Sequence, residues 1–166
     1  MVEQDEALLL AVLNSAPVVD GRPTDRLAGE SGRRLARDWG GSGDEVETAV
    51  LRRVRNALHI AVRQGVAPDV EELADVMEDV VRVPRLVSSG VEWELRVPAE
   101  RRLAVDAILA WAEVSARLPG RLRPCANNEC ALFLIDHSRP GTAKWCSMAT
   151  CGNRIKARTH ARRQGS

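Results

Sequence analysis

The sequence contains few aromatic residues: four Trp, one Phe and no Tyr among 166 residues. A core with so few aromatics consists mainly of Leu, Val, Ala and Ile, a composition that favours helices over a β-sandwich. Long apolar runs are also absent, since the run at 8–13 holds six residues and a membrane span requires about 20. The acidic segment 1–6 lacks the basic start of a signal peptide. We therefore expect a cytoplasmic protein without a membrane partner.

Cysteine is absent from residues 1–124, and the four cysteines form two pairs, Cys125-x4-Cys130 and Cys146-x4-Cys151, separated by fifteen residues. Two close thiol pairs at matched spacing predict a tetrahedral four-thiolate zinc site. A reducing compartment favours one structural Zn²⁺ over disulfides. Two disulfides, or four free buried cysteines, are the alternatives.

Residues 1–120 lack the signatures of an enzyme. They contain no phosphate-binding glycine loop and no nucleophile–base set, and their single histidine, His59, has no obvious partner. The acidic run Glu71, Glu72 and Asp75 is typical of a solvated helix face. A zinc ion held by four cysteines has no open position for water. We therefore expect no enzymatic activity and nominate no catalytic residue.

Charge divides the chain into two parts. Residues 1–120 hold 15 Lys and Arg against 21 Asp and Glu, a net charge of −6. Residues 121–166 hold 9 basic and 2 acidic residues, a net charge of +7. Four thiolates and one Zn²⁺ would reduce the second value to about +5. An acidic body with a basic tail is typical of a regulator that contacts nucleic acid at one end.

The hydrophobic periodicity predicts a mainly α-helical domain with one β-hairpin over residues 1–120. A Ser42–Glu45 capping box is expected to open the central helix, whose core stripe is Val46, Val50, Val54, Leu58 and Ala61. The other expected elements are helices at 8–13, 31–39, 69–83 and 98–118, a loop at 17–24, and a hairpin formed by 85–87 and 91–97. Pro119-Gly120 marks the predicted domain boundary.

Residues 121–166 predict a small treble-clef-like zinc finger. A knuckle at 125–130 is followed by a strand at 131–136, a turn, and a returning segment at 144–148 that completes a hairpin. Cys151 is expected at the start of a final basic helix, where free N–H groups stabilise a thiolate. The expected core is small, so zinc would supply on the order of 10 kcal/mol of folding free energy. That core comprises Leu132, Phe133, Leu134, Ile135, Trp145 and Met148.

From Cys125 onward the sequence resembles the CGNR zinc-finger family, named for the tetrapeptide Cys151-Gly152-Asn153-Arg154. The similarity includes Arg123-x-Cys125, the strand ending in Asp136, Ser138-Arg139, Trp145-Cys146-Ser147-Met148 and Lys156. Members of that family usually carry a helical ABATE domain before the finger, and residues 8–118 are similar to it in length and helical pattern. The resemblance implies a stress-induced bacterial transcription regulator whose finger binds DNA.

The final helix supplies most of the candidate DNA-binding residues. Arginines at i, i+4 and i+8 form one stripe, and a second stripe lies beside it. Arg and Lys meet phosphates, while Asn153 and Arg154 at the helix start are placed to read base edges. For Asn153, a hydrogen bond to a cysteine sulfur or to the knuckle backbone is an equally weighted alternative. The full set is Arg139, Lys144, Asn153, Arg154, Lys156, Arg158, Arg162 and Arg163.

The predicted partner is double-stranded DNA. Single-stranded RNA is disfavoured, because Phe133 and Trp145 are the only aromatics of the finger and both are needed in its core. One small finger covers few base pairs, so specific binding calls for a homodimer or a second protein, with the contact in the body. The body is also a candidate sensor for a small-molecule effector. The alternatives are a protein–protein adaptor that docks an acidic partner, or a basic tail that is merely solvated.

Overall fold

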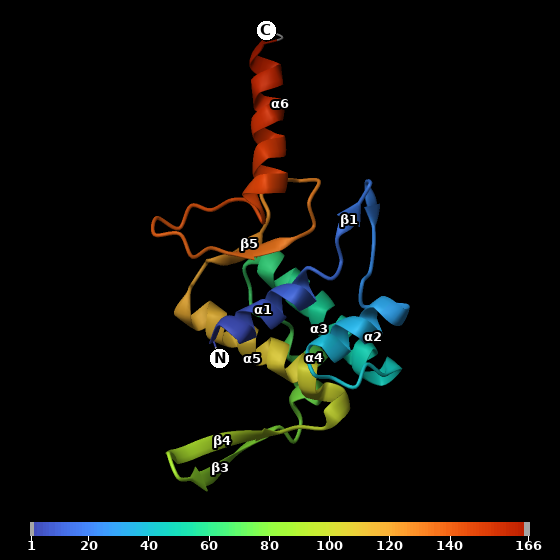
Figure 1. Ribbon diagram of the computed structural model, residues 1–166, viewed down its shortest axis with the longest axis vertical. Helices are drawn as coiled ribbons and strands as arrows, with labels where there is room; N and C mark the ends of the chain where they lie inside the picture. Colours follow the sequence, from blue (N-terminus) through green and yellow to red (C-terminus); the bar gives the residue numbers. More distant parts are fainter. Residues whose placement is uncertain (1, 165–166) are drawn as a thin grey trace.

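The computed structural model describes residues 2–164 and is mainly helical, with three two-stranded antiparallel sheets in that range (Figure 1). In chain order the elements are α1 (Val2–Leu13), β1 (Val18–Val19), β2 (Arg22–Pro23), α2 (Gly29–Asp38), α3 (Glu45–Gln64), α4 (Val70–Met77), β3 (Val81–Val87), β4 (Gly90–Arg96), a 3₁₀ turn (Ala99–Arg101), α5 (Arg102–Arg117), β5 (Leu122–Pro124), β6 (Phe133–Ile135), a π-helical turn (Met148–Gly152) and α6 (Asn153–Gln164). No helix within 2–164 is long and apolar enough to cross a bilayer.

The core of the body lies where α1, α3 and α5 pack against one another. Aliphatic side chains fill it, as the scarcity of aromatics predicts. Its fully buried members include Leu9, Leu13, Leu51, Leu58, Leu103 and Val105. Val54, Leu58 and Ala61 of α3 are buried as expected, whereas Val46 is 59% exposed, so the first position of the predicted stripe is wrong.

The cap of α3 lies two residues later than the sequence predicts. Asp44, not Ser42, is the N-cap, and its carboxylate accepts the Glu47 N–H at 2.7 Å. The Glu47 carboxylate, not that of Glu45, reaches back and accepts the Gly43 N–H at 2.7 Å. This arrangement resembles a capping box, except that Glu47 binds the N–H of the residue before the N-cap, while the Asp44 N–H donates to the Ser42 hydroxyl at 3.1 Å. The cap is shifted along the chain because Asp is as good a cap as Ser.

Two hairpins differ from the prediction. The expected loop at 17–24 contains β1 and β2, joined by Asp20 and Gly21 with φ of 50° and 74°, the left-handed values that a tight hairpin turn requires. The helix expected to run to residue 83 ends at Met77, because Asp79 also takes a positive φ of 59° and turns the chain. Residues 81–84 therefore belong to β3, whose seven residues all pair with β4.

The sheet of the finger also pairs differently from the prediction. β6 pairs with β5, the strand before the first cysteine, and not with 144–148. Phe133 at the start of β6 is 1% exposed and belongs to the core of the body, so the expected independent core of the finger is wrong. The finger therefore rests on the body. In Figure 1, α6 extends from one end of the molecule and β3–β4 from the other.

Candidate metal centre and basic helix

The four cysteine sulfurs converge on one point, all within 4.8 Å of one another. Cys146 Sγ lies 3.7 Å from Cys130 Sγ and 3.7 Å from Cys151 Sγ. Four sulfurs bound tetrahedrally to zinc at about 2.3 Å are about 3.8 Å apart, whereas a disulfide requires about 2.05 Å. The residues therefore fit one zinc ion, and none of the four forms a disulfide.

The first knuckle is shaped by Asn127, which is 2% exposed. Its side-chain oxygen accepts the Glu129 N–H at 3.2 Å, and its carbonyl accepts the Cys130 N–H at 2.8 Å. Its amide group donates to Cys151 Sγ at 3.5 Å, so it links both cysteine pairs. Asn127 thus donates a hydrogen bond to a cysteine sulfur, which is the structural role that the sequence also allowed for Asn153. Asn153 is exposed at the start of α6.

The second pair is held by a tight turn. The Cys146 N–H donates to Cys125 Sγ at 3.5 Å, and the Ser147 hydroxyl accepts the Thr150 N–H at 3.4 Å. Cys151 lies in the π-helical turn just before α6, close to the predicted helix start. A Cβ atom at Gly152 would lie 2.8 Å from the sulfur of Met148, so a larger residue here would displace the Met148 side chain that packs behind the ligand.

The protonation of the thiols shows why a cation suits this site. Burial and the neighbouring thiols raise the pKa of Cys146, and burial raises the pKa of Cys130. For Cys151, burial also acts upward, but hydrogen bonds from Asn127 and the other thiols outweigh it and lower the pKa. Without a metal, these shifts favour a thiolate at Cys151, and deprotonation of a second thiol beside it is opposed by charge repulsion. A divalent ion removes that repulsion, because thiolates bound to a metal are deprotonated.

Asp136 braces the loop between the two cysteine pairs. Its carboxylate, buried at the end of β6, accepts the N–H groups of Ser138 at 2.8 Å and Ala143 at 3.0 Å and pairs with Arg123. Hydrogen bonds from the Ser138 side chain and backbone and from Ala143, together with the charge of Arg123, lower the pKa of Asp136 to about 2 against the opposing effect of burial. Arg123 and Asp136 both belong to the motif noted in the sequence.

The seam between finger and body surrounds Phe133. The Asn14 side chain accepts the Phe133 N–H at 2.7 Å, and the His59 ring lies 4.6 Å from the Phe133 ring. The Arg63 guanidinium lies over the same ring and donates to the Ala131 carbonyl at 3.0 Å. His59 therefore has partners, contrary to the sequence reading: its Nε2 is also 2.7 Å from the Leu13 carbonyl.

A second tie joins α1 to the loop after β6. The Glu6 carboxylate, 9% exposed, pairs with Arg117 and lies 2.8 Å from His137 Nε2. None of the residues on the body side of the seam stands out in the sequence. On the finger side, Phe133 did stand out, because it is the single Phe of the chain and was expected to be buried.

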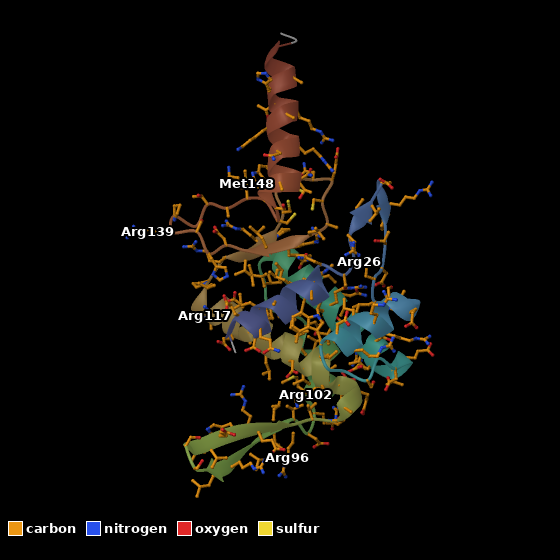
Figure 2. All side chains as sticks on the ribbon, viewed as in Figure 1. Arg26, Arg96, Arg102, Arg117, Arg139 and Met148 are labelled. Carbon is orange, nitrogen blue, oxygen red and sulfur yellow. The ribbon has the colours of Figure 1, made fainter. Side chains whose placement is uncertain are left out.

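The predicted DNA-binding residues are all exposed where the structure describes their side chains. Asn153, Arg154, Lys156 and Arg158 lie on α6. Arg139 and Lys144 lie on the loop that precedes the second cysteine pair, and Figure 2 shows Arg139 to the side of α6. The side chains of Arg162 and Arg163 lie outside the described residues.

Arg158 is paired, which the sequence did not indicate. Its guanidinium lies 2.9 Å from the carboxylate of Glu129 in the first knuckle. This hydrogen bond lowers the pKa of Glu129, and the charge of Arg154 lowers it further. Glu129 thus partly neutralises the two arginines at the base of the predicted stripe.

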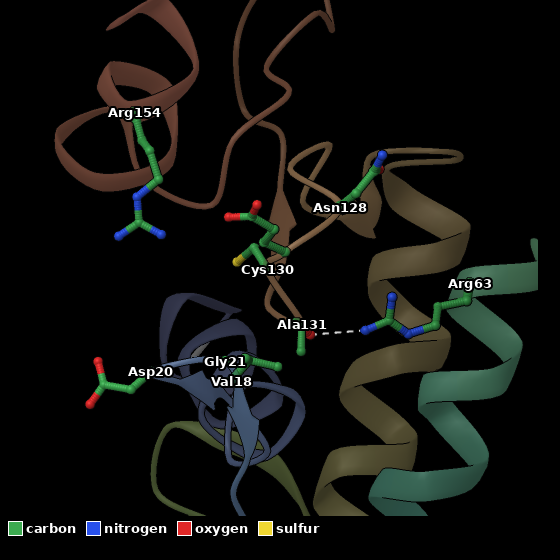
Figure 3. Close-up of a pocket in the computed structure, with 9 residues that line it drawn as sticks. Val18, Asp20, Gly21, Arg63, Asn128, Cys130, Ala131 and Arg154 are labelled. Carbon is green, nitrogen blue, oxygen red and sulfur yellow. Dashed lines mark hydrogen bonds between the residues drawn. The ribbon is translucent and has the colours of Figure 1, made fainter. Parts of the chain in front are cut away.

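A cleft of about 560 Å³ separates α6 from the β1–β2 hairpin. The guanidinium groups of Arg63 and Arg154 enter it from opposite sides, and Cys130 lies on its wall (Figure 3). Asp20 and Glu129 balance the two positive charges. Its lining is therefore neutral overall, which does not favour an anion.

Comparison with protein families agrees with this geometry. Residues 121–164 match the model of the CGNR zinc finger. This part of the chain is a CGNR zinc finger, and its four cysteines are placed so that they could bind one metal ion. A search of curated proteins finds no match to the chain. The match does not extend to residues 1–120, so the ABATE-like domain stays a prediction.

Proposed function

We propose that the protein is a transcription regulator whose zinc finger binds double-stranded DNA through α6. The observation that carries this proposal is the environment of α6. Residues 153–164 contain no acidic side chain, and the described side chains at 153–161 are exposed except for half-buried Ile155. In Figure 1 the helix extends away from the rest of the molecule.

Such a helix has little stability of its own. An isolated helix of about 12 residues is marginal in water, and like charges four positions apart, as at Arg154 and Arg158, weaken it further. A polyanion reverses this balance by neutralising the charges. The major groove of DNA is wide enough for an α-helix, and phosphates line its edges.

The zinc ion supplies structure rather than chemistry in this proposal. Four cysteine ligands leave no open position on the ion, so we assign no catalytic role to the site. The site instead fixes the direction of α6, since Cys151 and Gly152 lead directly into the helix. Asn153 and Arg154, in the first turn, are then the residues placed to meet bases.

The test is selection of bound sequences from random duplex DNA by the zinc-loaded full-length protein. Replacing both Arg154 and Arg158 with Ala is expected to weaken binding and to reduce the slope of log affinity against log salt by about two. The matched control replaces both Arg33 and Arg34 with Ala, because these are exposed arginines on α2, outside the finger. Enrichment of no sequence, with unchanged affinity in the double variant, would contradict DNA recognition and favour an acidic protein partner.

A further inference from the structure

The hairpin of β3 and β4, residues 81–96, presents an uncovered apolar face. We call this hairpin the arm. Its cross-strand register places Leu86 opposite Val91 and Pro84 opposite Trp93 on one face. Leu86 is 85% exposed, Trp93 64% and Val91 58%. A lone two-stranded hairpin is marginal in water, and an exposed apolar face is a common mark of an interface.

Beside this face lies a cleft of about 670 Å³, between the arm and helices α1 and α5. Leu95, Leu109 and Ala110 form an apolar floor, and Trp93 and Val91 line the arm side. The lining residues carry four carboxylates and two guanidinium groups, a net charge of −2. The cleft therefore favours an apolar segment with a positive charge.

The arm itself has these properties. Its tip, residues 86–91, is Leu-Val-Ser-Ser-Gly-Val and carries no charge. The whole arm holds three Arg and two Glu, a net charge of +1. One chain thus contains both an apolar, positively charged arm and an apolar, negatively charged cleft. A two-fold dimer requires a self-complementary surface, and these two surfaces provide one, because the arm of each copy can enter the cleft of the other.

We propose that the occupant of this cleft is the arm of a second copy of the chain. The two arms pack apolar face against apolar face, each in the cleft of its partner. This assigns a contact surface to the homodimer that the sequence predicts, and it does not rest on the proposed function.

The size of the arm sets the expected strength. A strand of seven residues is about 23 Å long, so two such hairpins with their clefts bury an area near the low end of stable interfaces, about 1,200 Å². Dimerisation is therefore expected to depend on concentration, with a Kd of about 1–100 μM.

Sedimentation equilibrium of the zinc-loaded full-length protein, without DNA, tests the proposal across this concentration range. The double variant Leu86→Ser with Trp93→Ser is expected to raise the Kd by at least about tenfold, because both side chains lie in the centre of the interface. Glu113→Lys, on the cleft wall, is expected to raise it by a smaller factor of roughly 2–5. Val70→Ser removes a similarly exposed apolar side chain outside the arm and is expected to leave the Kd unchanged.

Far-UV circular dichroism verifies that each variant is folded. The double variant is expected to fold, because Leu86 and Trp93 are exposed and do not belong to the core. A monomeric wild-type protein throughout the range would overturn the proposal. Equal Kd values for the wild type and the arm double variant would overturn it as well. Because DNA is absent from this measurement, neither result depends on whether the finger binds DNA.

Discussion

Asp136 shows how one buried carboxylate links acid stability to the shape of the finger. Its pKa in the folded protein is about 2, below its ordinary value of 3.8. On acidification the unfolded chain takes up the proton first, so the contribution of Asp136 to stability is complete above about pH 4 and is lost as the pH falls towards 2. The loop that carries Ser138 and Ala143 loses its brace over the same interval.

Asp136→Asn is therefore expected to lower the denaturant midpoint at neutral pH, because the neutral amide leaves the Arg123 charge without its partner. The comparison uses metal-free, reduced protein, since acid also protonates the thiols and releases zinc. The difference in midpoint between the variant and the wild type should shrink between about pH 4 and pH 2. A difference that stays constant with pH would show that the charge of Asp136 is not the cause.

Glu129 is a residue at which the charge of the finger can be tuned. Its pair with Arg158 is exposed, and exposed pairs are weak, so a phosphate can displace the carboxylate. Glu129→Gln is expected to raise affinity for any duplex by roughly 2- to 10-fold and to steepen the salt dependence by about one phosphate. Glu72→Gln makes the same change of charge on α4, outside both the finger and the arm, and serves as control.

Titrations at several salt concentrations measure both quantities. An unchanged or weakened affinity in Glu129→Gln would mean that the carboxylate orients Arg158 for binding instead of competing for it. Either result is specific to this knuckle only if Glu72→Gln behaves like the wild type.

Among the elements, the two halves of the finger depend on zinc to different degrees. β5 and β6 are anchored in the body through Phe133 and Asn14, whereas the cysteines join the two knuckles and the start of α6 to one another. Removal of zinc is expected to abolish hydrogen-exchange protection at 125–130 and 144–164 while 122–124 and 133–135 keep theirs.

Hydrogen exchange with and without a chelator, with zinc content measured on the same samples, tests this prediction. The wild type should contain one zinc ion per chain. Loss of protection throughout 121–164 would show that the seam at Phe133 does not hold without the metal.

The elements that could be predicted from the sequence are those whose signal is local. Spacing within a few residues predicts the paired cysteines, the buried face of α3 that contains Leu58, and the alternating strand at 91–97. The tight turn at Asp20-Gly21 also carried a local signal, which the short flanking strands obscured. β5 and β6 have three residues each, too few to show alternation, and their pairing joins segments on either side of a knuckle.

The candidate site also has a part that could be predicted from local spacing and a part that could not. The cysteine spacing predicts that the four cysteines lie together, and the structure confirms this cluster. Its supports could not be predicted in this way. Arg63 and Glu6 reach the finger from the body, and Asn127, in the first knuckle, donates to Cys151, 24 residues further along the chain. The choice between Asn127 and Asn153 as the sulfur donor depends on the path of the knuckle, which spacing alone does not fix.

At the scale of the whole molecule, Phe133 joins the metal-binding part to the helical core. Phe133→Ala is expected to reduce the free energy of unfolding by about 3–5 kcal/mol, since it removes a fully buried aromatic side chain and leaves a cavity. Urea denaturation followed by helicity measures the loss across the body, with Val70→Ala as an exposed control. If helices of the body keep wild-type stability in Phe133→Ala, finger and body are independent units.

The positions of the arm and α6 at opposite ends give the dimer a distinctive consequence (Figure 1). A dimer joined through its arms carries the two α6 helices at its outer ends, far from the joint. Such a molecule suits two separate duplexes better than two adjacent half-sites on one duplex, for which recognition helices lie about one helical turn apart. We therefore expect the wild type, at concentrations above its dimerisation Kd, to hold a labelled duplex on an immobilised one.

The variant Leu86→Ser with Trp93→Ser should bind a single duplex with wild-type affinity but lose this bridging, because each monomer has one α6. The Arg154→Ala with Arg158→Ala variant should lose both properties, which separates failure of the dimer from failure of DNA binding. Bridging by the arm variant at the wild-type level would place the dimer contact elsewhere. Tight binding of one duplex by two copies of the wild type, without bridging, would require the two α6 helices to lie on the same side of the dimer.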